Sequence, residues 1–215
     1  MEVRRTRNGA MGNLEMSTGD MRAVIRLLTA VERTPEQERV LGFAREQCAR
    51  TDARFEDQGI KLDVPVAQAL EELLEGSPSA DMEPAYTYAF QSLVAVNFSD
   101  THDLGYWRRP SWFYTVDEEM TRHGVPADLA PAAILFGGPP IRLPHPGDAV
   151  PWMGTFPASR AAEVVEAYEA VLDRLDPEVR ETAEVLLEPM RVEVDEWEET
   201  KKAGRTQDTV FFWLR

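Results

Sequence analysis

The segment that constrains the rest of the chain most is Ile134-Leu-Phe-Gly-Gly-Pro-Pro-Ile-Arg-Leu-Pro-His-Pro-Gly-Asp-Ala-Val-Pro-Trp-Met-Gly154. It holds five of the fifteen prolines and four of the thirteen glycines, interleaved with large apolar side chains. Proline fixes φ and lacks an N–H donor, so the segment can be neither a helix nor a central strand. Because it is also too apolar for a solvated linker, we expect a rigid, partly extended belt (residues 134–154) packed against helices on either side.

Apolar residues recur at helical spacing before and after the belt and predict seven or eight helices. Asp20 is a good N-cap for the first helix, and Thr34 forms a capping box with Gln37 at the start of the second. Asp63 and Ser159 are the expected caps of two later helices.

The segment from Pro84 to Phe98 is apolar nearly all round, which predicts a helix at the middle of the molecule with the other helices around it. The best strand is Thr209 to Leu214, which we expect to pair with the Trp152 region or with residues 1–16, a flexible arm or edge strand. The predicted fold is therefore α+β, predominantly α-helical, with a small antiparallel sheet that includes the C-terminal strand. Residues 17–215 should form a single domain.

Two helices carry more specific expectations. A helix that begins at Ser111 should point Asp117, Glu118 and Glu119 outward. In the last helical region, the apolar spacing runs straight through Pro189, which predicts a kink or short break just before that residue.

The net charge of −15 is unevenly placed. Residues 163–199 contain fourteen acidic residues and three arginines, which gives −11 in one largely helical stretch. Such a surface repels nucleic acids and anionic membranes and attracts a basic protein, although the same charge can simply aid solubility. The residues expected to bind this partner are Glu181, Glu184, Glu188, Asp195, Glu196 and Glu199.

Other compositional features exclude several classes of protein. No run approaches the roughly 18 apolar residues that cross a bilayer, and no signal peptide is evident, so we expect a cytoplasmic protein. The single cysteine, Cys48, lies on an apolar helical stripe and is expected in the core. No metal-ligand, cofactor or catalytic motif is present, which disfavours an enzyme and leaves the question open.

The densest polar group comprises Asp100, His102 and Asp103. A histidine flanked by carboxylates can act as a general base, and His145 on the belt offers a second imidazole on a proline-fixed backbone. Both histidines also have ordinary structural explanations, as part of a polar loop and as a cap for a buried carbonyl. If the chain is instead a small-molecule enzyme or ligand-binding protein, its pocket should lie between the His102 loop and the belt, lined by Trp107, Arg108, Arg109, Trp112, Arg142 and Trp152.

Several short motifs together resemble an uncharacterised family of actinobacterial proteins, domain of unknown function 7691. They are Gly59-Ile60, the helix from Val66 to Gly76, Tyr86 to Ala89, Trp112 with Val116-Asp117, the belt from Leu135 to Pro144, and Leu175 to Arg180. The amino-terminal third and the carboxyl end depart from the family pattern. The resemblance implies a bacterial, cytoplasmic, α-rich domain and provides no catalytic residues.

These observations favour a non-catalytic, acidic protein-binding module, of the immunity or inhibitor kind, that neutralises a basic partner such as a bacterial toxin. No cofactor or metal is expected. A further reading is a homo-oligomer that associates through an exposed strand at Phe211 to Trp213.

Overall fold

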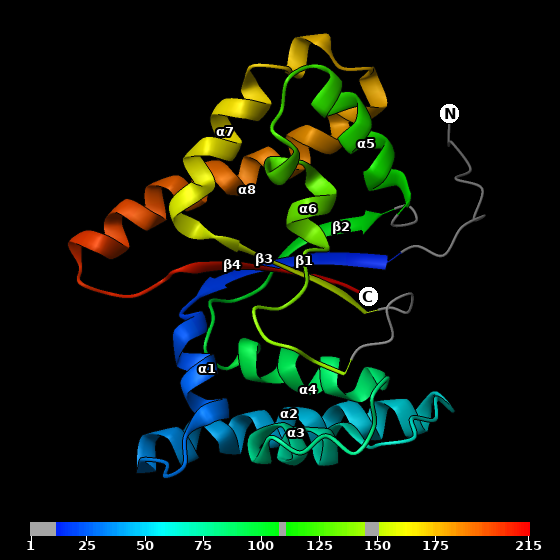
Figure 1. Cartoon of the computed structure of the whole chain (residues 1–215), viewed down its shortest axis with the longest axis vertical. Helices are drawn as coiled ribbons and strands as arrows, with labels where there is room; N and C mark the ends of the chain where they lie inside the picture. Colours follow the sequence, from blue (N-terminus) through cyan, green and yellow to red (C-terminus); the bar gives the residue numbers. More distant parts are fainter. Residues whose placement is uncertain (1–11, 108–110, 145–150) are drawn as a thin grey trace.

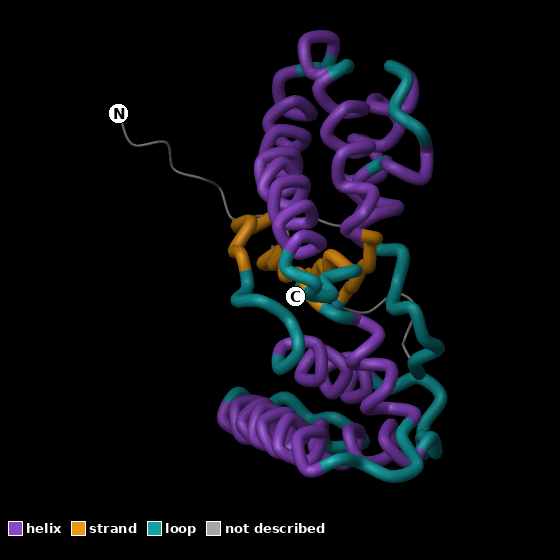
Figure 2. Tube along the Cα trace, turned by 90° about the vertical axis from the view of Figure 1, so that its left-hand side faces the viewer, coloured by secondary structure: helices purple, strands orange, loops and turns teal. Residues whose placement is uncertain are grey.

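A computed structural model describes residues 12–107, 111–144 and 151–215. Within these ranges the chain forms eight α-helices and a four-stranded antiparallel sheet, so the fold is α+β and predominantly helical. Figures 1 and 2 show the sheet between two layers of helices, with α1–α4 on one face and α5–α8 on the other. The elements are β1 (Gly12–Gly19), α1 (Met21–Thr29), α2 (Pro35–Asp57), α3 (Val66–Glu75), α4 (Pro84–Ala95), β2 (His102–Trp107), α5 (Ser111–Arg122), α6 (Pro131–Leu135), β3 (Trp152–Pro157), α7 (Ala161–Glu169), α8 (Pro177–Lys202) and β4 (Thr209–Leu214), with short 3-10 turns before α6, α7 and α8.

The sheet has the strand order β2-β1-β4-β3, so β1 and β4 are its two internal strands. The C-terminal strand β4 pairs with β1 through Met16 and Phe212 and with β3 through Gly154 and Phe212. Both expected pairings are therefore present. The expectation of an arm or edge strand is wrong for residues 12–16, which lie in the interior of the sheet, and residues 1–11 lie outside the described ranges.

Alternation along β4 creates two separate hydrophobic cores. Val210, Phe212 and Leu214 face the α5–α8 layer, whereas Phe211 and Trp213 face the α1–α4 layer. Successive residues of a strand point to opposite faces, so a continuous apolar strand must be covered on both sides. The suggestion that Phe211 to Trp213 form an exposed edge is wrong, because these residues are buried in an internal strand.

The helix α4 was expected at the centre of the molecule, but the sheet lies there instead. α4 is buried by α2, α3 and α1 on its own side of the sheet, and its side chains Tyr86 and Phe90 are fully covered. An all-round apolar helix indicates burial without saying which element will cover it. Cys48 is buried in the same core, as expected.

The belt joins the two layers. Its first residues, Ile134 and Leu135, close α6, so the exclusion of a helix is wrong at that end. Its last residues begin β3, which is an edge strand and so agrees with the exclusion of a central strand. Between them, Phe136 packs on the α5–α8 core and Ile141 on the α1–α4 core. The backbone N–H of Gly138 also donates to the carbonyl of Met153, at 3.1 Å. The described residues between α6 and β3, 136–144, thus pack against both layers and along the edge strand β3.

Two details of the helices differ from expectation. α8 runs unbroken from Pro177 to Lys202 with Pro189 inside it, so there is no short break before that residue. On α5, Glu119 is only 8% exposed and accepts a hydrogen bond from the backbone N–H of Asp176. Asp117 is half-buried and accepts one from the N–H of Ala132. Two of the three carboxylates expected to point outward are therefore used inside the fold.

Candidate partner-binding surface

The acidic stretch identified in the sequence lies mainly on α8, which is held firmly in place. Pro177 occupies the first turn, where a missing N–H costs nothing. The inward side of the helix buries apolar side chains at helical spacing: Val179, Ala183, Leu186, Leu187 and Met190. Fixed on this core, the opposite side of α8 must face water.

Polar contacts tie the same helix to other elements. The indole Nε1 of Trp112 donates to the Thr182 hydroxyl at 3.0 Å, and the guanidinium of Arg191 pairs with Glu169 on α7 at 2.7 Å. These contacts set the rotation of α8 about its axis. They therefore decide which of its carboxylates are exposed.

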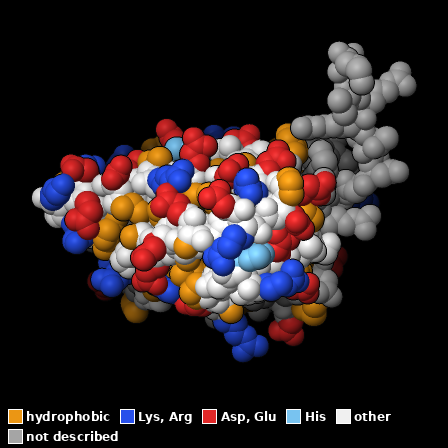
Figure 3. Space-filling model, turned by 90° about the horizontal axis from the view of Figure 1, so that it is seen from above, with side chains coloured by type: hydrophobic (Ala, Val, Ile, Leu, Met, Phe, Trp, Pro, Cys, Tyr) orange, Lys and Arg blue, Asp and Glu red, His pale blue; other side chains and the backbone are white. Residues whose placement is uncertain are grey.

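The six carboxylates predicted to bind a partner all lie on the outward side of α8. With 100° between successive residues, they fall within about 60° of one line along the helix. We name this set the acidic stripe: Glu181, Glu184, Glu188, Asp195, Glu196 and Glu199, all exposed. At a rise of 1.5 Å per residue it is about 27 Å long. Figure 3 looks onto the α5–α8 layer and shows acidic side chains spread over the visible face, with Lys and Arg side chains among them.

Most of the negative charge in the acidic stripe is uncompensated. Among the described residues only Glu199 of the six makes an ion pair, with Lys202 at 2.9 Å. Two acidic residues of the same layer that lie off the stripe are paired: Glu163 with Arg160, and Glu169 with Arg191. Like charges three or four residues apart, as in Glu181, Glu184 and Glu188, destabilise a helix by about 0.2–0.5 kcal/mol per pair. The stripe therefore carries an electrostatic cost that a cation from outside would relieve.

An exposed apolar side chain lies inside the acidic stripe. Val192 falls between Glu188 and Asp195 on the same line and is 46% exposed. An isolated exposed valine is ordinary on a protein surface. Because Val192 is surrounded by the carboxylates of the acidic stripe, however, it could give a partner a small apolar contact.

His102 and Asp103 lie on a strand and not in the polar loop that was one explanation of the sequence. His102 begins the edge strand β2, opposite Met16 of β1, and so faces the α5–α8 layer. Asp103 accepts a hydrogen bond from the N–H of Gly105, whose φ is +87°, at a bulge in the pairing of β1 with β2. Asp103 is thus occupied with local geometry, and Asp100 is exposed ahead of the strand.

Two of the three tryptophans proposed for a pocket, Trp107 and Trp152, lie in a packed chain of aromatic side chains. Trp107 contacts Phe113, Phe113 contacts Phe136, and Phe136 contacts Trp152, with ring centroids 5.3–5.5 Å apart. The indole N–H of Trp107 already donates to the Leu104 carbonyl. The structure therefore brings Trp107 and Trp152 into one cluster, as parts of the core around the belt.

The histidine and the aromatic cluster do not share a site. His102 and Trp107 lie at opposite ends of β2, about 16 Å apart at 3.3 Å per residue, and Trp152 is on the opposite edge of the sheet from His102. Arg142 is exposed on the belt. The remaining predicted residues, Arg108, Arg109 and His145, lie outside the described ranges.

Two surface hollows are present elsewhere among the described residues. One, of about 430 Å³, is lined by Thr18, Asp20, Asn97, Ser99, Arg205 and Gln207. The other, of about 390 Å³, lies at the end of α2 and is lined by Asp52, Phe55, Gly59, Ile60, Lys61 and Leu62. Neither contains a residue that the sequence analysis proposed for a pocket.

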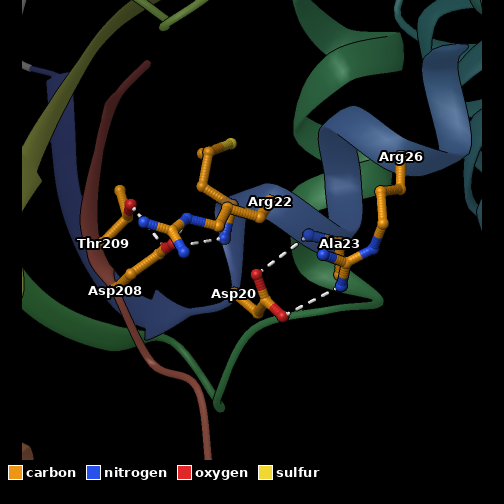
Figure 4. A network of polar contacts seen from close by, with 7 residues as sticks. Asp20, Arg22, Ala23, Arg26, Asp208 and Thr209 are labelled. Carbon is orange, nitrogen blue, oxygen red and sulfur yellow. Dashed lines mark hydrogen bonds and ion pairs between the residues drawn. The ribbon is translucent and has the colours of Figure 1, made fainter.

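The carboxylates beside the first hollow are already bound within the protein. Asp20 accepts from the backbone N–H of Ala23 and pairs with Arg26, while Asp208 pairs with Arg22 (Figure 4). This network attaches the start of α1 to the start of β4. No group of three or more potential metal-ligating side chains occurs in the described part of the chain.

Sequence reasoning missed one residue of chemical interest, Glu193. It lies on the buried side of α8 and accepts a hydrogen bond from the Thr18 hydroxyl at 2.6 Å. Burial raises the pKa of Glu193, the Thr18 hydrogen bond lowers it, the charge of Glu196 raises it, and that of His102 lowers it. The signal was present in the sequence, because Glu193 falls between Met190 and Trp197 on the inward spacing of the helix.

Comparison with models of known families finds a match over most of the chain. A family model described as Domain of unknown function (DUF7691) matches residues 11–214, almost the whole chain. The chain belongs to the DUF7691 family. No curated protein and no solved structure matches it.

For this DUF7691 member, the roles of individual residues therefore rest on its own geometry. The family match covers both helical layers and all four strands. None of the helices in the described residues is long and apolar enough to span a membrane.

Proposed function

We propose that this protein is a non-catalytic binding module that takes a basic protein partner on the acidic stripe of α8. The observation that carries the proposal is the row of exposed carboxylates, about 27 Å long, of which only Glu199 has an ion-pair partner among the described residues. An acidic face of this kind increases the rate of encounter with a cationic partner and disfavours an anionic one.

The stripe also suggests the shape of the partner's contact. Carboxylates repeat along one side of a helix with Val192 between them, so a basic helix or extended segment with Lys or Arg around an apolar side chain would match it. An immunity or inhibitor protein in the bacterial cytoplasm, neutralising a basic toxin, is the biological form of this proposal. Nucleic acids and anionic membranes are unsuitable, because their phosphates would be repelled.

A binding experiment with charge-reversed variants tests the proposal. The probe is a fluorescent, helical, lysine-rich peptide, and its affinity is measured by anisotropy at 50 and 300 mM NaCl. The wild type should bind it, with affinity at least about tenfold weaker at the higher salt because exposed charges are screened. The triple variant Glu181→Lys, Glu184→Lys, Glu188→Lys should lose binding.

A matched control separates the stripe from the overall charge. The triple variant Glu46→Lys, Glu56→Lys, Asp57→Lys changes the net charge by the same amount at exposed positions of α2. It should retain most of the affinity. Equal loss in both triple variants, or binding that ignores salt, would refute a specific role for the stripe. The natural partner can then be sought as a basic protein retained by the wild type and the α2 variant, and not by the α8 variant.

A further inference from the structure

Glu193 is an acidic residue in a place where acids are rarely found. It lies on the inward side of α8, over the sheet, and only 3% of its surface is exposed. A carboxylate removed from water is costly unless positive charge or several donors compensate for it. The contacts of Glu193 therefore decide in which protonation state it is best accommodated.

The compensation that the fold provides is small. The Thr18 hydroxyl, itself on a residue 2% exposed, donates to Oε1 of Glu193. No lysine or arginine pairs with Glu193 in the part of the chain that the structure describes. The charged groups whose fields reach it are His102 on β2, which favours the ionised form, and Glu196 on α8 itself, which opposes it.

Other hydrogen bonds hold Thr18 in place, so its hydrogen bond with Glu193 connects β1 to α8. Its backbone N–H donates to the Ser99 hydroxyl at 3.1 Å, and its carbonyl accepts from the Ser99 N–H at 2.9 Å. On the other side, Glu193 begins the last third of α8. Near the end of that part, the hydroxyl of Thr200 donates to Oε1 of Gln207, ahead of β4.

We propose that buried Glu193 is a proton-controlled latch, which holds the last turns of α8 on the sheet while it is protonated and weakens when it ionises, because the hydrogen bond from Thr18 offsets only part of the cost of burying the charge. The latch is a property of the fold and does not depend on a partner for the acidic stripe. It acts on the part of α8 that carries Asp195, Glu196 and Glu199, so it would also control how firmly that end of the stripe is presented.

The direction of the pH dependence follows from burial. Because the pKa of Glu193 is raised in the folded protein above its ordinary value of 4.5, the folded state retains the proton to higher pH than the unfolded chain. The stabilisation is therefore complete below about pH 4.5 and is lost as pH rises through the folded-state pKa.

The test is urea denaturation of the wild type and of Glu193→Gln between pH 5 and pH 8. Glutamine resembles the protonated acid at every pH and keeps an oxygen for Thr18. The ratio of the variant's folding equilibrium constant to that of the wild type should therefore grow with pH, by up to about tenfold per pH unit below the folded-state pKa. A constant loss caused by the buried amide would not change this slope.

Two further variants make the result decisive. Glu184→Gln removes the same charge from an exposed position of α8 and should show a much flatter ratio; equal slopes for Glu184→Gln and Glu193→Gln would overturn the latch. Thr18→Val removes the donor, so it should cost more stability at pH 8 than at pH 5. In the Glu193→Gln background, that cost should be independent of pH; a cost in the wild-type background that does not change with pH would also contradict the proposal.

Discussion

Gly154 shows how a single residue can join distant parts of this fold. It ends the belt, lies in the edge strand β3 opposite Phe212, and faces the end of α6. A β-carbon at this position would overlap the carbonyl oxygen of Ile134 and the backbone of Leu135. Since backbone atoms on both sides would have to move, only glycine allows α6 to approach the sheet this closely.

We therefore expect Gly154→Ala to lower the free energy of unfolding by about 3 kcal/mol or more, through backbone displacement in the core. Gly42→Ala is the matched control, because Gly42 lies within α2 and a β-carbon there would meet nothing within 4 Å. The control should stabilise the protein by about 0.5–1 kcal/mol. Urea denaturation of both variants measures the effects, and a neutral Gly154→Ala would show that α6 and β3 are less closely packed.

At the level of helices, carboxylates from other elements do much of the capping. Asp52 on α2 accepts from the backbone N–H groups of Val66 and Ala67 at 2.7 and 2.9 Å, and so caps α3. Asp117 and Glu119 on α5 serve α6 and the residue before α8 in the same way. Each contact satisfies a free N–H and fixes one helix relative to another.

Replacing Asp52, which caps α3 from another helix, should destabilise the protein more than replacing Asp63, which lies just before α3 in the sequence. Asp52→Ala should lower the free energy of unfolding by about 1–2 kcal/mol, because two N–H groups lose their acceptor. Asp63→Ala, at the cap expected from the sequence, should change it by less than about 0.5 kcal/mol, since Asp63 is exposed and the N-cap position is Pro65. Equal costs for the two variants in urea denaturation would mean that Asp63 also contributes to the cap.

Local caps were predicted correctly where both partners are close in sequence. Asp20 caps α1, and the Thr34 and Gln37 capping box begins α2, as expected. The predictions that Asp63 and Ser159 cap helices were wrong, because Pro65 and Arg160 occupy the N-cap positions of α3 and α7. A sequence pattern shows only what neighbours can do, whereas a carboxylate from another helix can make a local cap unnecessary.

For the whole molecule, the excess of negative charge opposes compact folding. The net charge is −15, and the acidic stripe concentrates part of it on one helix. Raising NaCl from 20 to 300 mM should therefore increase the free energy of unfolding, since salt screens repulsion between exposed charges.

The triple lysine variant of the acidic stripe should respond less to salt. Its net charge is −9, since three Glu→Lys changes add six positive charges to −15. At low salt it should also be more stable than the wild type, because the smaller net charge reduces repulsion over the whole molecule, whereas repulsion among the three changed positions persists with the sign of the charges reversed. Urea denaturation at both salt concentrations measures this, and an identical response of the two proteins would show that the stripe is already screened.

The amino-acid pattern alone established the fold class, most helices, the caps of α1 and α2 and the C-terminal strand, because these depend on neighbours along the chain and on the 3.6-residue and two-residue periods. Patterns also located the acidic stripe. Contacts between distant segments decided the rest: the internal position of β1, the edge strand at His102, the separation of His102 from Trp152, and the meeting of Glu193 with Thr18. These contacts join residues up to 200 positions apart, as where Leu14 of β1 pairs with Leu214 of β4, so they form only when the chain folds and the sheet brings both cores together.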